Sequence, residues 1–122
     1  MSTIKVDNIR IASESVSRPA TGVAAAWVNY NQATPAISNS INISSVSDEG
    51  AGEYVTSFTS NMANDTYCEA GMGRAYHINT SSSDDKSSSG DRHQTFYVSK
   101  LDGGRTSVDM IRSYVVYHGE LA

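Results

Sequence analysis

The residues of this chain whose types could support chemistry are its three histidines and an acidic, serine-rich stretch. Imidazole is a common metal ligand and titrates near neutral pH. His77, His93 and His118 are never two or four residues apart, so no two of them form a paired site along one strand or helix. A single histidine could still meet its symmetry mates on a threefold axis and bind an axial metal, but ordinary strand or loop histidines are the favoured interpretation. We therefore expect no metal site.

The acidic stretch, residues 79–91, is low in complexity and almost entirely polar. It resembles a calcium loop in composition only, because oxygen ligands at alternate positions and a closing glutamate are missing. Such a segment is expected to form a solvated loop. Exposed loops on a rigid scaffold often carry recognition. We therefore assign the candidate receptor contacts to this loop, namely Asp84, Asp85, Lys86, Asp91 and Arg92.

Catalysis is not indicated by the motifs. Ser, His and Asp occur, but no Gly-x-Ser-x-Gly elbow is present. Glu49 and Glu53 straddle an expected turn like the paired carboxylates of a glycosidase. Spike enzymes that cut polysaccharides use much longer platforms than this chain. We expect no catalytic residue, no cofactor and no enzymatic activity.

Charge and cysteine content exclude further classes. The net charge is −4, and the nine basic residues are scattered, which disfavours a nucleic-acid partner. Cys68 is the single cysteine, so no intrachain disulfide or thiolate cluster can form. No apolar run approaches the ~20 residues that span a bilayer, and no signal-peptide core is visible near Met1. We expect a soluble product of the cytoplasm with no membrane partner.

The elements that would position these residues are strands, because apolar residues recur with period two. Ser, Thr, Asn, Gly and Tyr dominate, and all are poor helix formers. The pattern predicts an all-β fold, an antiparallel β-sandwich of about seven strands. The expected strands cover residues 3–11, 24–30, 37–46, 54–58, 67–78, 94–101 and 106–118.

The chain divides into residues 1–22, an N-terminal strand and linker, and residues 23–122, the sandwich. The first strand alternates in two phases, so it has two apolar faces and the layout of a swapped assembly arm. Trp27 is the largest apolar side chain and is expected to anchor either the two sheets or two subunits. The predicted core and assembly residues are Ile4, Val6, Ile9, Ile11, Trp27 and Tyr30.

Three blocks carry a resemblance to a known family: AAWVNY at 25–30, ISNSINISSV at 37–46 and DEGAGEY at 48–54, followed by Phe58 and Met62. Their order and gaps resemble the C-terminal module of phage tail fibre and related virion proteins. STIKVD at 2–7 and SYVVYHG at 113–119 resemble the opening and closing segments of fibre-like proteins from phages of marine cyanobacteria. Together the matching segments extend over roughly nine tenths of the chain. The polar insertion at 79–91 departs from the pattern, so the family's receptor surface does not carry over.

The resemblance implies a virion structural protein: a tail fibre or tail-tip subunit that binds the host surface as a homotrimer, with other virion proteins and a host glycan or protein as partners. It would be assembled in the host cytoplasm and reside in the virion. A capsid fibre or decoration protein docked on the shell is one alternative. A free carbohydrate-binding module is the alternative from another class.

Overall fold

Strands and turns make up the whole described structure. The computed structural model describes residues 6–9, 12, 15, 18–19, 23–73, 77–81, 86–99 and 101–122. All of its elements are β-strands, and all strand pairs are antiparallel. Within those residues, no helix is present that could cross a membrane. The all-β expectation is confirmed.

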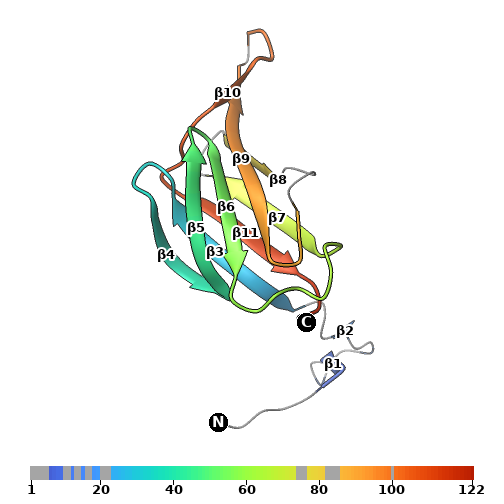
Figure 1. Cartoon of the computed structure of the whole chain (residues 1–122). Helices are drawn as coiled ribbons and strands as arrows, with labels where there is room; N and C mark the ends of the chain where they lie inside the picture. Colours follow the sequence, from blue (N-terminus) through green and yellow to red (C-terminus); the bar gives the residue numbers. More distant parts are fainter. Residues whose placement is uncertain are drawn as a thin grey trace.

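Two sheets stack face to face (Figure 1). The first has the order β10-β9-β6-β5, and β8 also pairs with β9. Its strands are β5 (Ile43–Gly50), β6 (Glu53–Phe58), β8 (His77–Ser81), β9 (Gly90–Val98) and β10 (Arg105–Ser107).

The second sheet has the order β4-β3-β11-β7. Its strands are β3 (Ala24–Asn31), β4 (Ala36–Ile41), β7 (Cys68–Gly73) and β11 (Ser113–His118). A separate short pair, β1 (Asn8–Ile9) and β2 (Arg18–Pro19), lies beyond the end of the sandwich where β3 begins (Figure 1). The described sheets therefore hold more strands than the predicted seven.

The alternation of buried and more exposed side chains along the strands places the hydrophobic core between the two sheets. Along β6, Tyr54, Thr56 and Phe58 are buried, and the residues between them are half-buried. β3 and β11 alternate in the same way, because successive side chains of a strand point to opposite faces. Aromatic rings fill the interior, with Phe58 edge-on to Tyr117 at a centroid distance of 5.0 Å. The buried hydrophobic cluster is Ala26, Val28, Tyr30, Tyr54, Phe58, Met62, Tyr67, Val115 and Tyr117.

The predicted strand at 37–46 is wrong in one respect: it is two strands in different sheets. The chain turns at Asn42, whose φ of 56° lies in the left-handed region that asparagine tolerates. Its side chain fixes the corner, because Oδ1 accepts from the Ser60 amide at 2.8 Å and Nδ2 donates to the Ser60 carbonyl at 3.0 Å. Period-two alternation runs through such a corner unbroken, so the sequence pattern cannot reveal it.

The expected strands at 67–78 and 106–118 divide for a similar reason. β7 belongs to one sheet and β8 to the other, and β10 and β11 are likewise in different sheets. The polar loop expected at 79–91 is also shorter than predicted. β8 extends to Ser81, and β9 already begins at Gly90.

The turn between β5 and β6 depends on Gly52. Its φ is 73°, and a Cβ there would lie 2.8 Å from the Val108 backbone nitrogen and press on the Thr95 carbonyl. Gly103 has a nearly equal φ of 70° but open space around it. Alanine substitutions at the two glycines can therefore separate the cost of backbone strain from the cost of steric overlap.

We expect Gly52→Ala to lower the free energy of unfolding by about 2 kcal/mol more than Gly103→Ala, because only the first adds overlap with rigid backbone. Urea denaturation of both variants measures the difference. Equal losses would show that the neighbouring strands shift easily and that φ alone matters.

The N-terminal arm is described in part. Val6 is half-exposed and, with Val23, Ala25 and Leu121, lines a hollow at the end of the sandwich. Ile4 and Ile11 lie outside the described residues, as does the side chain of Ile9.

Candidate functional site

The candidate receptor residues do not form one exposed loop. Asp84 and Asp85 lie outside the described residues. Arg92 points outward from β9, with Nη1 3.5 Å from Glu53 Oε2. Lys86 turns toward the protein, and its Nζ donates to the Tyr67 carbonyl at 2.7 Å.

The expectation that Asp91 is exposed in the loop is wrong. Asp91 is the second residue of β9 and is fully buried. It points inward because Asp91, His93 and Thr95 share the inward phase of the strand, opposite to Arg92. It cannot contact a receptor in this fold.

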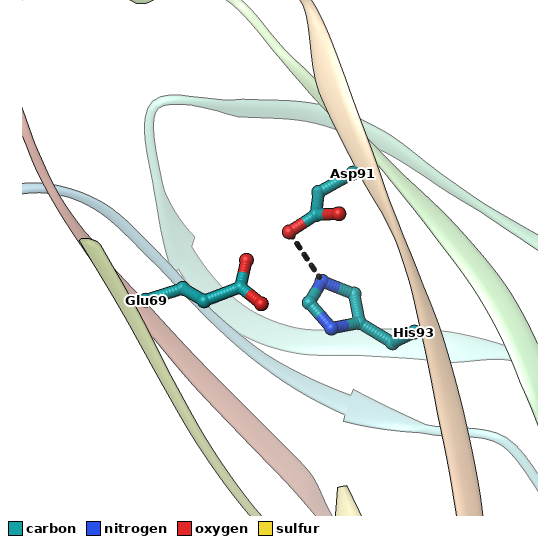
Figure 2. A group of neighbouring side chains, drawn as sticks. All are labelled: Glu69, Asp91 and His93. Atoms are coloured by element: carbon teal, nitrogen blue, oxygen red, sulfur yellow. Dashed lines mark ion pairs between the residues drawn. The ribbon is translucent and has the colours of Figure 1, made fainter. Parts of the chain in front are cut away.

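Asp91 instead belongs to a buried group that we call the acid–histidine cluster, formed by Glu69, Asp91 and His93. Figure 2 shows the Glu69 carboxylate and the Asp91 carboxylate approaching the His93 ring from two sides. One ligand atom from each residue lies within 4.8 Å of the others. His93 Nε2 lies 3.8 Å from Asp91 Oδ2. β7 and β9 belong to different sheets, so the cluster spans the interior.

A chain of short hydrogen bonds ties the cluster to the aromatic core. His93 Nε2 shares a hydrogen bond with Tyr117 Oη at 2.6 Å. Tyr117 Oη also pairs with Thr56 Oγ1 at 2.8 Å. The His93 ring stacks on Tyr54 at a centroid distance of 5.0 Å, and the Tyr54 hydroxyl pairs with Ser113 Oγ at 2.6 Å. These contacts connect the two sheets through polar atoms.

Lys86 supplies a positive charge at the edge of the cluster. Its Nζ lies 3.9 Å from Glu69 Oε2 and 4.2 Å from the centroid of the Tyr67 ring. The Lys86 and Glu69 side chains are 22% and 16% exposed, so water screens this pair less than it screens a surface pair. The ammonium therefore offsets part of the buried negative charge.

Burial controls the proton affinities. Loss of hydration lowers the pKa of His93 to about 4; the Lys86 charge adds to this, while Glu69 opposes it. His93 is thus neutral at neutral pH, and its short hydrogen bond to Tyr117 does not require a charged ring. Burial also raises the pKa of the Tyr117 and Tyr67 hydroxyls above the usual value, so both stay protonated.

An imidazole with two carboxylates is a donor set that transition metals accept. Two of the groups are already engaged, since Lys86 faces Glu69 and Tyr117 holds His93 Nε2. The geometry favours a structural role for the acid–histidine cluster, in which hydrogen bonds between polar side chains hold the two sheets together.

The axial-metal interpretation of a single histidine does not hold for His93, because a ring that is 1% exposed inside one subunit cannot meet its symmetry mates. His118 lies half-buried on β11, opposite Cys68. The side chain of His77 lies outside the described residues.

A second candidate lies on the outside of the four-stranded sheet, and we call it the uncharged face. Its rows follow from strand register, since Ile41, Trp27, Val116 and Ala70 are cross-strand neighbours, as are Tyr114 and Met72. The face is built from Trp27, Ile41, Ala70, Met72, Tyr114 and Val116, with Cys68, Asn29, Asn39 and His118 around them. Met72 is 69% exposed and Ile41 54%. None of these positions carries Asp, Glu, Lys or Arg.

The outer face of the other sheet is different. There Arg92 pairs with Glu53, and Gln94 Nε2 donates to Glu53 Oε1 at 3.3 Å. Val55 is the apolar residue at its centre, between Ser47 and Arg92. The outer face of the β10-β9-β6-β5 sheet is thus mainly polar, whereas the uncharged face exposes apolar side chains to water.

The uncharged face is hollowed. A groove of about 440 Å³ runs over β3, β11 and β7, with Trp27, Tyr114 and Met72 among its lining residues. Gly71 and Ala70 of β7 line one side of the groove, and their small size makes the groove deeper there. Of the two roles expected for Trp27, that of an anchor between the sheets is wrong, because Trp27 points away from the interior, whereas Tyr30 is buried there. An anchor between subunits stays a prediction.

Sequence reasoning missed the acid–histidine cluster. It compared histidines only with each other, although Asp91 and His93 are two residues apart and share one face of a strand. That spacing was the available signal. Glu69 could not be added without knowing that β7 faces β9 across the interior.

Comparison of the chain with protein-family models, with curated proteins and with solved structures returns no match.

Proposed function

We propose that this chain is a virion structural protein, a tail fibre or tail-tip subunit that binds the host surface as a homotrimer. The main support for the proposal is the uncharged face, because exposed apolar side chains gathered on the outside of a sheet mark a contact with another protein. The order of sequence blocks at 25–62, which resembles fibre modules, supplies the virion context.

The two ends of the sandwich differ in a way that suits attachment and presentation. The β1–β2 pair and the C-terminus lie at one end, and the β9–β10 hairpin projects from the other (Figure 1). Leu101 is almost fully exposed near the tip of this hairpin. A Gly104 amide that donates to Asp102 Oδ1 at 2.9 Å shapes the turn and holds the Asp102 pKa below its usual value. The hairpin end is the proposed receptor surface.

The test is the mass of the purified chain in solution, together with deletion of residues 1–12. We expect a trimer for the full chain and a monomer or aggregate after deletion, because the arm has two apolar faces. A full chain that stays monomeric at high micromolar concentration contradicts the proposal. An unchanged mass after deletion would show that the arm does not contribute to assembly, although the chain is still a trimer.

Position in the particle is tested by antibody labelling. Labelled tails support a fibre or tip subunit, and labelled shells support a capsid fibre or decoration protein docked at a symmetry axis.

A free carbohydrate-binding module is the second candidate. Trp27 and Tyr114 on one hollowed face favour it, because aromatic rings stack on sugars. Binding of the isolated chain to a glycan array, together with its absence from particles by mass spectrometry, would establish this function in place of the first.

A further inference from the structure

We infer that the uncharged face is the contact between subunits: the faces of the three copies meet around a common axis, and Met72 on the edge strand β7 of one copy lies against the groove on the face of the next. This inference rests on the proposed oligomeric function and names the partner of its surface. It adds the sheet formed by β4, β3, β11 and β7 to the contact proposed for the N-terminal arm, so that the assembly depends on both.

The lack of charged residues on the uncharged face favours a second copy of this chain as the partner that covers it. The chain carries a net charge of −4, so two copies repel each other wherever their charged surfaces meet. The outward positions of this sheet hold none of the 13 acidic or nine basic residues. Packing the two faces together therefore brings apolar surface into contact without placing like charges opposite each other. An acidic or basic partner would find no complementary charge here.

Shape supports the same choice. The face carries a projection and a hollow side by side, since Met72 is highly exposed at the groove that Trp27 and Tyr114 line. When the face meets its own copy, the Met72 side chain of one subunit can enter the groove of the next. Methionine suits this role because its unbranched chain fits irregular gaps.

The residue types match those that dominate binding energy at protein contacts. Trp and Tyr are enriched among hot spots, and Met is enriched at interface cores. The face extends across four strands and measures roughly 20 Å by 20 Å. Counted on both partners, that is roughly 800 Å², below the roughly 1,200 Å² at which stable specific interfaces begin, so we expect a weak assembly whose mass depends on concentration.

A sugar is the weaker occupant, because a sugar site combines aromatic rings with several polar groups that hold the hydroxyls. The groove is lined by Trp27, Val28, Ala70, Gly71, Met72, Tyr114, Val115 and Val116, and tyrosine alone among these carries a polar side-chain oxygen.

The experiment compares two charge insertions with a matched control in the full chain. Met72→Glu adds a carboxylate to a side chain that is 69% exposed, so the fold of the single subunit has little reason to change. Val116→Glu adds one at the centre of the face, on an inner strand. Val55→Glu is the control, since Val55 is equally half-buried and outward on the inner strand β6 of the other sheet.

Analytical ultracentrifugation over a concentration series gives the readout, with circular dichroism to verify the fold. We expect Met72→Glu and Val116→Glu to weaken association by roughly 100-fold, because each buries an unpaired charge in the contact. Val55→Glu should change it by less than about 3-fold. A wild-type oligomer that both face variants retain overturns the inference and leaves the proposed trimer standing. A monomeric wild type overturns both.

Cys68 provides a second measurement that needs no substitution. It is exposed on β7 in the same outward phase as Ala70 and Met72. A short bis-maleimide should link subunits through Cys68 in the wild type and lose that product in Met72→Glu. Equal cross-linking in both proteins contradicts the inference, and a glycan that blocks cross-linking would assign the groove to sugar instead.

Discussion

Replacing Lys86 with methionine should lower the free energy of unfolding by about 3 kcal/mol at neutral pH. The ammonium lies 3.9 Å from Glu69 Oε2, beside a cluster that also contains the fully buried Asp91. Removing it leaves two carboxylates in the interior without that positive neighbour, and water reaches them poorly. Its hydrogen bond to the Tyr67 carbonyl is lost as well.

Arg92→Met is the matched control. Both cations come from the segment expected to contact a receptor, but Arg92 faces outward and pairs with the more exposed Glu53. A surface pair of this kind contributes between 0 and about 1 kcal/mol, so the control should be nearly neutral. Urea denaturation of the two variants gives the comparison. If the losses are equal, Lys86 is a surface residue in solution and its role in the cluster is wrong.

The faces of several strands could be predicted from the sequence because alternation reports directly on them. Tyr54, Thr56 and Phe58 alternate with other residues in the sequence, and all three are buried on one face. Cys68, Ala70 and Met72 have the same spacing and likewise share one face, which points outward. Alternation does not say which of two faces points inward, however. Trp27 shows the consequence: the largest apolar side chain of the chain lies outside the sandwich.

Sheet membership could not be predicted from periodicity. A strand that turns a corner at Asn42 and changes sheets keeps the same spacing of apolar residues. The acid–histidine cluster depends on that membership, because Glu69 meets His93 only when β7 and β9 lie in opposite sheets. The burial of Asp91 follows from the same cause. In a serine-rich segment it has the sequence features of a solvated loop, and the pairing of β9 with β6 places it inside.

Stability should fall as the pH is lowered from about 6.5 to about 4, and His93 should account for up to about 3 kcal/mol of the loss. Burial lowers the His93 pKa from 6.5 to about 4 in the folded chain. Within that window the unfolded chain binds a proton at this residue and the folded chain does not, so acid favours unfolding. Above pH 6.5 neither state is protonated there and the contribution is fully present. Below pH 4 both states are protonated and no further loss arises from His93.

Urea denaturation at a series of pH values, on the wild type and on His93→Gln, isolates this contribution. Glutamine keeps a polar group near Tyr117 Oη but does not titrate, so its stability should fall less steeply between pH 6.5 and 4. His118→Gln removes a histidine outside the cluster and should retain the steep decline of the wild type. If His93→Gln declines as steeply as the wild type, the acid sensitivity belongs to the carboxylates alone. In that case His93 takes up its proton in the folded chain near the pH at which it does so when unfolded, and the neutral His93–Tyr117 hydrogen bond is not what joins the two sheets.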